Sequence, residues 1–467
     1  MVDIDTAATY NDHNVYILGA GFSAEAGYPL IKDFMHRMRD AATWLQSNPQ
    51  RERERKAIER VLKFRLSAAA AAYRVPLNIE NAEELFSLAT VGGDNELAQD
   101  MTLAIAATLD FAQITASPLN ENQFFGVGVL NVPGWTKPKS WSPPSTFLRN
   151  FSQNDTSART WYSCSPYEYY LGLMCGYFEQ GDANRRNTII SLNYDLIVEN
   201  ALRNLGIGYT YAVLGNKLTH DSVRGFVSSP LQDEALKLLK LHGSINWYTH
   251  GFYKREQAFA NIAEIGLTLE GDPLTDLEGT AFVNRVSAAL RQVSVYDSYT
   301  DLKTHKEGGM PFLVPPTWSK SLTVPLTDVW NQAVAALRTA TRIIIMGYSI
   351  PATDLHFRYL VAAGLQENIS LRKIFFVNSG LAEHSPQKQQ LKERLLSLFR
   401  PEHFEQGTVE AVPIDIRTFL AGPQNMEERS YRLAIGRTVN AIEHMYDTAN
   451  TAPWKVYTGS GSSFIIV

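Results

Sequence analysis

The sequence has little cysteine and no excess of positive charge. Its 467 residues include two cysteines, Cys164 and Cys175, which are too few for a disulfide framework or a four-thiolate zinc site. The 43 lysines and arginines are outnumbered by 48 aspartates and glutamates, which gives a net charge of −5. A broadly basic, nonspecific nucleic-acid binder is therefore excluded, although the total leaves room for a local basic patch.

Long hydrophobic runs are also missing. The first 14 residues contain neither a basic start nor the apolar stretch that marks a signal peptide. No apolar run approaches the roughly 18–20 residues that cross a bilayer. With 45% hydrophobic and 19% charged residues, the composition is that of a folded globular protein. We therefore expect a soluble, cytoplasmic protein with the length of roughly two to three domains.

Short apolar runs that end in glycine or a polar residue form the clearest pattern in the chain. Five of them lie at 15–18, 188–192, 238–241, 342–346 and 373–377, and a sixth lies at 409–416. Such runs, rich in β-branched and aromatic residues, are typical of buried parallel strands. Amphipathic helices are predicted between them, at 328–340 and 387–399. This alternation predicts a doubly wound α/β fold around a parallel sheet.

Two long insertions interrupt the predicted sheet, at about 32–185 and about 250–325. The first is mostly helical in pattern, and its charge run at 51–60 predicts a solvated helix face. Its aromatic-rich part, 120–170, is either a lid or subunit interface, or a loop packed on the helices. We predict an N-terminal tail at 1–14, one sheet-containing domain at 15–420, and a C-terminal tail at 421–467 with a helix near 425–445.

The candidate functional residues follow the predicted strands at their carboxyl ends, the edge where doubly wound sheets bind ligands. Gly19-Ala20-Gly21 follows the first strand and precedes a predicted helix. Glycines there allow a phosphate to approach the backbone N–H groups and the positive end of the helix. The same pattern also occurs in strand–helix turns that bind no ligand.

Polar side chains at the other strand ends have two interpretations each. Asn193 offers a donor and an acceptor for orienting a water or a carboxamide, but asparagine also caps helices, and Asp195 has the same ambiguity. His242 is suited to general-base chemistry near neutral pH, although a lone histidine is more often a packing residue. The convergence of these residues with Ser349 and Asn378 at one edge predicts a ligand site.

Together these segments resemble the Sir2 (sirtuin) superfamily. Gly19-Ala20-Gly21-Phe22-Ser23, with Gly27 and Pro29, is similar to the phosphate loop of the family, GAGxS…GxP. The further similarities are Asn193-Tyr194-Asp195 to its NxD motif, His242-Gly243 to its catalytic HG, Gly347-Tyr348-Ser349 to its GTS, and Asn378 to a late strand-end asparagine. The motifs occur in family order between residues 15 and 420.

The sequence departs from the protein-deacetylating sirtuins in two places. Those carry a four-cysteine zinc module between HG and GTS, where this chain has no cysteine, and D-F-R after the loop proline, where it has Leu30-Ile31-Lys32. A zinc-free core with large helical insertions is more similar to bacterial Sir2-like effectors of anti-phage defence, as are the segments 78–80 and 314–318. This resemblance implies a Rossmann-like Sir2 core that hydrolyses NAD to nicotinamide and ADP-ribose without a metal.

The resemblance also implies a role for each motif. Asn193 and His242 are the implied catalytic residues, with Asn193 orienting the water or the ribose hydroxyls and His242 accepting a proton. The implied NAD-binding residues are Gly19, Ala20, Gly21, Phe22, Ser23, Asp195, Gly347, Ser349 and Asn378. Members commonly act as homo-oligomers activated by a partner chain or an infection signal. An NAD-dependent deacylase or ADP-ribosyltransferase, and a non-catalytic module that binds NAD or ADP-ribose, remain alternatives.

Overall fold

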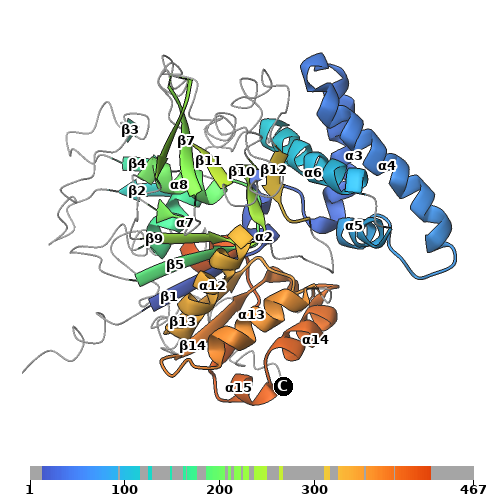
Figure 1. Cartoon of the computed structure of the whole chain (residues 1–467). Helices are drawn as coiled ribbons and strands as arrows, with labels where there is room; N and C mark the ends of the chain where they lie inside the picture. Colours follow the sequence, from blue (N-terminus) through green and yellow to red (C-terminus); the bar gives the residue numbers. More distant parts are fainter. Residues whose placement is uncertain are drawn as a thin grey trace, which may run out of the picture.

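A parallel sheet of seven strands organises the chain in its computed structural model (Figure 1). The structure describes residues 13–92, 95–115, 125–128, 148–149, 161–164, 166–175, 186–205, 209–211, 215–221, 225–230, 236–249, 262–266, 310–315, 324–351, 354–382 and 384–421. The helix predicted near 425–445 and most of the second insertion lie outside these residues.

The order of the strands confirms the predicted doubly wound α/β class. The sheet runs β15-β14-β13-β1-β5-β9-β6, and every neighbouring pair is parallel. From β1 the chain goes to β5 and β9 on one side and later to β13, β14 and β15 on the other, so the order reverses at β1. The strands are β1 (His13–Leu18), β5 (Arg186–Ser191), β6 (Tyr209–Thr210), β9 (Leu236–Lys240), β13 (Arg342–Met346), β14 (Lys373–Val377) and β15 (Val409–Val412).

The central strands are buried, with apolar residues at their centres and polar residues mainly at their starts. Every residue of β1 and β13 is buried, and the polar start of β1 is accommodated by hydrogen bonds. The ring nitrogens of His13 lie 2.9 Å and 3.0 Å from the hydroxyls of Thr339 and Thr188. β15 is shorter than the predicted run at 409–416: it ends before Pro413, which has no N–H to continue a strand ladder.

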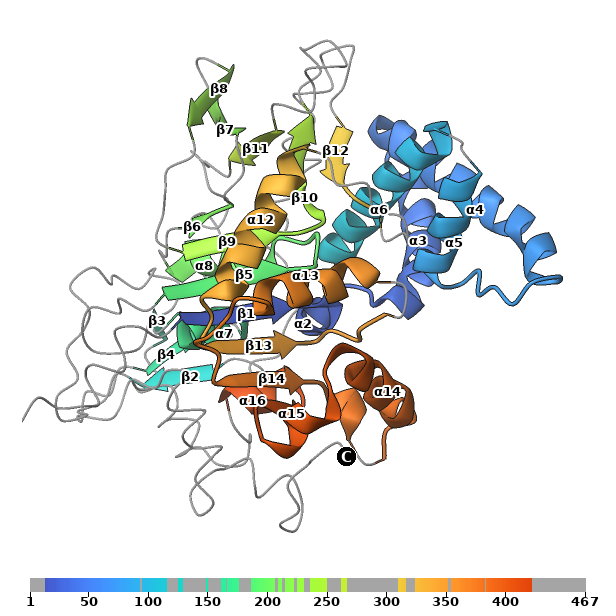
Figure 2. The same ribbon diagram turned by 60° about the horizontal axis from the view of Figure 1, so that its bottom comes forward.

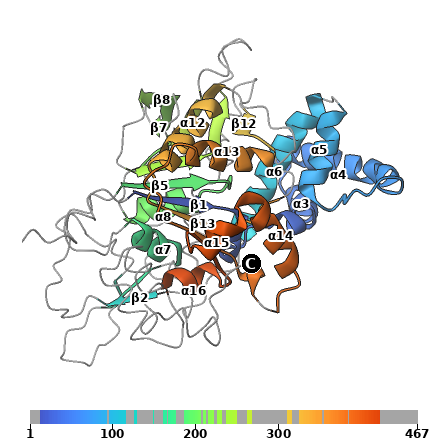
Figure 3. The ribbon, with the colours of Figure 1, turned by 90° about the horizontal axis from the view of Figure 1, so that it is seen from below.

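Helices cover both faces of the sheet. In Figure 3, α12 (Val324–Arg338) and α13 (Leu355–Leu365) lie on one side of β1 and β5, and α7 (Pro166–Met174) and α8 (Ile197–Leu205) lie on the other. Between β14 and β15 come α14 (Lys388–Leu398) and α15 (Pro401–Glu405), and α16 (Ile416–Ala421) follows β15. Helices α12 and α14 confirm those predicted at 328–340 and 387–399.

The first insertion begins with a group of helices beyond the end of the sheet where α2 (Ala20–Ser23) follows β1 (Figure 2). They are α3 (Ile31–Gln46), α4 (Glu52–Ala72), α5 (Ala82–Val91) and α6 (Asn95–Thr115). Helix α4 carries the charge run with most of its charged side chains at least partly exposed, as predicted, although Glu54 is buried. An ion pair of 2.6 Å between Arg51 and Asp110 ties the start of α4 to α6.

Two smaller sheets accompany the main one. The first is antiparallel, in the order β2-β4-β3, with β2 (Phe125–Gly128), β3 (Leu148–Arg149) and β4 (Trp161–Cys164). The second runs β12-β10-β11-β7-β8, with β7 (Gly215–Asp221), β8 (Gly225–Pro230), β10 (Gly243–Thr249), β11 (Ile262–Gly266) and β12 (Met310–Leu313). Strand β10 follows β9 after a tight turn at Leu241 and His242. No helix within the described residues is long and apolar enough to span a membrane.

Candidate functional site

A cavity of about 1200 Å³ lies at the carboxyl ends of β1, β5, β13 and β14, bordered on the far side by the helices of the first insertion. Of the residues proposed from the sequence, it is lined by Ala20, Gly21, Phe22, Ser23, Asn193, Asp195, His242, Gly347, Ser349 and Asn378. Gly19 is buried directly beside it. The fold therefore brings the dispersed motifs to one place, at the reversal of strand order where such sheets bind ligands.

The glycines of the first motif are required by contact between two turns of the protein itself. Gly21 donates its N–H to the carbonyl of Gly347 at 2.8 Å. A Cβ at Gly21 would lie 2.8 Å from that oxygen, and one at Gly347 would lie 2.4 Å from the nitrogen of Phe22. Gly347 also has φ +65°, in the left-handed region that favours glycine. Backbone packing thus explains these glycines without a ligand.

A short helix follows this glycine turn. Helix α2 has four residues and continues as a 3₁₀ turn over Ala24–Ala26, which ends at Gly27 with φ 85°. The next long helix, α3, begins only at Ile31. The predicted helix after the glycine turn is therefore present, and its first turn lies at the cavity.

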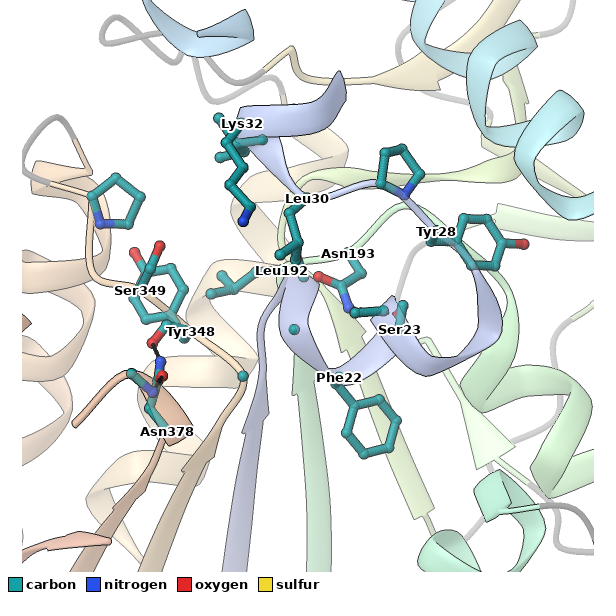
Figure 4. Close-up of a pocket in the computed structure, with 18 of the residues that line it drawn as sticks. Phe22, Ser23, Tyr28, Leu30, Lys32, Leu192, Asn193, Tyr348, Ser349 and Asn378 are labelled. Carbon is teal, nitrogen blue, oxygen red and sulfur yellow. Dashed lines mark hydrogen bonds between the residues drawn. The ribbon is translucent and has the colours of Figure 1, made fainter. Parts of the chain in front are cut away.

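Asn193 donates both of its amide hydrogens to other groups of the protein. Its Nδ2 donates to the carbonyl of Gly19 at 2.9 Å and to Oγ of Ser23 at 3.0 Å. Because a carbonyl oxygen only accepts, the amide nitrogen must face Gly19. Figure 4 shows this nitrogen directed toward Ser23 and the amide oxygen on the other side. Asn193 therefore offers an acceptor, but no further donor.

His242 is fixed in a similar way. Its Nδ1 lies 3.1 Å from the carbonyl oxygen of Leu192, so Nδ1 carries the hydrogen of this bond. In the neutral ring Nε2 is then the basic nitrogen. The ring packs against Tyr194, with 6.1 Å between the ring centroids, and the Tyr194 hydroxyl donates to the Val314 carbonyl at 2.6 Å. Asn193 and His242 thus supply two acceptors, which suit a hydroxyl or a water rather than an anion.

Other predicted residues serve mainly to shape the turns around the cavity. Asp195 accepts the N–H of Ile197 at 3.2 Å, which is the capping role that the sequence left open. Asn378 donates to the Tyr348 carbonyl at 2.9 Å and accepts from the Gly380 N–H at 2.8 Å. These bonds use one donor and one acceptor of Asn378, so its side chain fixes a turn as well as lining the cavity.

Part of the aromatic-rich segment packs under the glycine turn. The ring of Phe22 points away from Asn193 in Figure 4 and contacts Tyr167 and Tyr170 edge to face. The Tyr167 hydroxyl donates to the Phe22 carbonyl at 2.9 Å and accepts from the Ala26 N–H at 3.0 Å. Burial and the charge of Glu25 raise the pKa of Tyr167, which therefore remains a neutral hydrogen-bonding group. For this part of 120–170, packing is the interpretation that the contacts support.

Apart from Asp195, the acidic lining of the cavity was not predicted from the sequence. Seven carboxylates contribute to it: Glu25, Glu80, Glu83, Glu84, Asp195, Asp354 and Asp415. Glu83, in the first turn of α5, is 5% exposed. Burial, and next the charge of Glu83, raise the pKa of the Tyr194 hydroxyl. The capping pattern Asn81-Ala82-Glu83 is visible in the sequence, but nothing local places it at the cavity.

Two basic side chains, those of Lys32 and Arg394, lie in the same lining. Lys32 points into the cavity in Figure 4, and Arg394 donates from Nη1 to the Ser349 carbonyl at 3.1 Å. Glu80 of the segment 78–80 instead forms ion pairs with Arg39 and Arg65, which join α3 and α4 to the start of α5. Within the described ranges, no three His, Cys, Asp or Glu residues are grouped as a metal site.

The fold and the cavity define an α/β protein with a ligand site at the carboxyl edge of a doubly wound sheet. Residues 187–292 match the sequence profile of a family described as SIR2-like domain. This part of the chain is thus similar to the SIR2-like domain family, which supports the resemblance to the Sir2 superfamily seen in the motifs. The matched range includes Asn193, Asp195 and His242, but not the turns at 19–23 and 347–349. No curated protein sequence is significantly similar to the chain.

Solved structures of sirtuins are also similar to the chain, at a low level. One is Sir2Tm bound to a propionylated peptide, with 12% identity, 92% of this chain and 100% of that one covered, and a TM-score of 0.33. Another is a Sir2 homologue in complex with NAD, with 12% identity, 85% and 96% covered, and a TM-score of 0.29. Similarity at this level assigns no role to individual residues of this chain.

Proposed function

We propose that the chain is an NAD+ glycohydrolase, which converts NAD+ and water to nicotinamide, ADP-ribose and a proton. The observation that supports the proposal is the pair of acceptors, Asn193 Oδ1 and His242 Nε2, which line one cavity and lie in the segment 187–292 that is similar to the SIR2-like domain family. Two acceptors hold a water by its two hydrogens, or one of them accepts the single hydrogen of a ribose hydroxyl. His242 then takes the proton as the nucleophile attacks the ribose carbon that loses nicotinamide.

The charge of the cavity lining supports a ligand of this kind. NAD+ carries a cationic pyridinium ring and an anionic pyrophosphate, and its cleavage passes through a cation-like sugar, as in other glycosyl transfers. Buried carboxylates such as Glu83 suit the cationic part. We assign the pyrophosphate to the vicinity of Lys32 and Arg394, because elsewhere the acidic lining repels it.

The biological setting is a further part of the proposal and rests on the resemblance described from the motifs. We propose a cytoplasmic effector of bacterial anti-phage defence that depletes cellular NAD+. In this proposal the protein is a homo-oligomer, and a partner chain or an infection-derived signal activates it. The domain at 15–420 would contain the complete catalytic site, because the described cavity residues fall between Ala20 and Ile416.

The test is chromatography of NAD+ incubated with the purified full chain, alone and with proteins that co-purify from its host. Release of nicotinamide and ADP-ribose by the wild type, and not by His242→Ala or Asn193→Ala, supports the hydrolase. Consumption of NAD+ only with an acylated peptide or a protein acceptor, detected by mass spectrometry, would point to a deacylase or ADP-ribosyltransferase. Calorimetric binding of NAD+ without product in every assembly would point to a binding module.

A further inference from the structure

A buried ion pair lies close to the chain segments that carry the two candidate catalytic residues. Lys240 is the last residue of β9 and is 1% exposed, and Glu199, in the first turn of α8, is fully buried. Their Nζ and Oε1 atoms are 3.0 Å apart. The Tyr211 hydroxyl donates to the same carboxylate oxygen at 3.1 Å. Because taking two charges out of water costs several kcal/mol per ion, this pair requires an explanation beyond stability.

The ion pair sits where two turns meet: the Asn193 turn (residues 191–196) and the His242 turn (residues 240–245). Backbone and side-chain bonds already join them, from Leu241 N to Ser191 O at 3.0 Å, from His242 Nδ1 to Leu192 O at 3.1 Å, from Ile245 N to Tyr194 O at 3.0 Å and from Ser244 Oγ to Tyr194 O at 3.4 Å. Lys240 Nζ adds another by donating to the carbonyl of Asp195. This is a charge-assisted bond, the strong class of hydrogen bond.

We propose that Lys240 and Glu199 are positioning residues that hold the Asn193 turn and the His242 turn at a fixed separation. Glu199 orients the ammonium of Lys240, and Lys240 fixes the backbone at Asp195, two residues after Asn193. The relative position of the two acceptors at the cavity then depends on this pair. Its effect on turnover rests on the proposed hydrolase, but its effect on the placement of the His242 ring does not.

Burial governs the electrostatics of Glu199. It raises the pKa of this carboxyl above the ordinary value, and the neighbouring Lys240 ammonium offsets only part of the effect. Removing one partner alone therefore leaves a buried polar or charged group without its counterpart, which destabilises the fold strongly. A single variant does not separate positioning from folding. A double variant with apolar residues of similar volume does, since such replacements of buried pairs are often neutral in stability.

The experiment compares Lys240→Met/Glu199→Leu with the wild type in the full chain. Its control is Lys373→Met/Glu410→Leu, which replaces a cross-strand pair of 2.9 Å at β14 and β15, outside the cavity lining. We expect single Lys240→Met to lower Tm by roughly 10 °C and the double variant to recover most of this loss. The double variant is expected to keep KM nearly unchanged and to lose kcat by about 10- to 100-fold, as misplaced catalytic groups do. The control keeps kcat.

A second readout separates this proposal from the proposed function. The nitrogen-15 NMR signals of the His242 ring report its bond to the Leu192 carbonyl, whether or not the chain hydrolyses NAD+. We expect them to change in Lys240→Met/Glu199→Leu and not in the control pair. If they stay unchanged, or if the folded double variant turns over as fast as the wild type, the positioning role is wrong. A changed signal in a chain that releases no nicotinamide, either alone or with its co-purifying proteins, would support positioning and reject the hydrolase.

Discussion

At the scale of single residues, hydrogen bonds decide which atoms of the site can react. Asn193 donates its two amide hydrogens to Gly19 and Ser23, and His242 donates its Nδ1 hydrogen to the carbonyl of Leu192. In the neutral ring Nε2 of His242 is the basic nitrogen, and the second polar atom of the Asn193 amide, Oδ1, is an acceptor. The arrangement suits activation of a nucleophile by removal of its proton.

His242→Asn tests this division of roles between the two ring nitrogens. The Asn amide nitrogen can replace Nδ1 as the donor to Leu192, whereas the acceptor at Nε2 is lost. We expect Tm to change little and kcat to fall about 10²–10⁴-fold, the usual contribution of a general base. Nicotinamide release and thermal unfolding measure the two effects. Full activity of a folded His242→Asn variant would remove this histidine from the mechanism.

Glu83→Gln tests whether the buried carboxylate stabilises positive charge during cleavage. The substitution keeps the shape of the side chain and removes its charge, so we expect kcat to fall tenfold or more while Tm is nearly retained. Glu84→Gln is the comparison, because Glu84 is half-exposed and already accepts the Asn78 N–H at 2.7 Å. Its charge is better screened by water, and a smaller loss is expected. Equal losses of kcat in both variants would contradict the assignment.

At the scale of elements, the cavity depends on close contact between two turns from distant parts of the chain. The turn after β1 and the turn after β13 meet backbone to backbone, and glycine is present on both sides of the contact. A glycine-rich phosphate loop and a glycine-rich packing contact look the same in sequence. The structure shows that packing alone requires glycine at Gly21 and Gly347, while the surface facing the cavity remains available for a ligand.

Gly347→Ala and Gly407→Ala form a matched pair for this contact. Both glycines have positive φ, +65° and +73°, but a Cβ at Gly407 meets nothing within 4 Å. We expect Gly407→Ala to cost about 1–2 kcal/mol of unfolding free energy from the backbone alone. Gly347→Ala should cost about 1–3 kcal/mol more, because its Cβ must displace the turn at Phe22. Denaturant unfolding measures both, and equal losses would show that the contact is not tight.

At the scale of the whole molecule, two different parts of the fold line the cavity: the parallel sheet and the first insertion. The parallel sheet supplies the turns with Asn193 and His242, and the first insertion supplies the acidic start of α5. A ligand that touches both parts stabilises the folded chain as a whole, because it binds the native state and not the unfolded one.

Thermal unfolding with NAD+ tests this coupling. At about 100 times Kd the ligand adds about 2.7 kcal/mol, so we expect Tm to rise by several degrees. Arg394→Gln should reduce this rise if the guanidinium holds the pyrophosphate. Arg372→Gln, at an exposed position outside the cavity lining, should leave it intact. A rise that is identical in all three proteins would place the pyrophosphate away from Arg394.

The sequence by itself determined six of the seven strands of the main sheet and the motifs at their ends, but not the two-residue strand β6. Apolar runs such as 342–346 and 373–377 are local patterns that can be recognised in the sequence. Because strands that alternate with helices allow few topologies, these runs were enough to predict the doubly wound sheet and the edge at which it binds ligands. The tertiary structure decided which atoms face the cavity. The amide orientation of Asn193, the ring orientation of His242, the burial of Glu83 and the pairing of Lys240 with Glu199 depend on contacts between distant segments. A local pattern does not contain such contacts, because only the folded chain brings the two partners together.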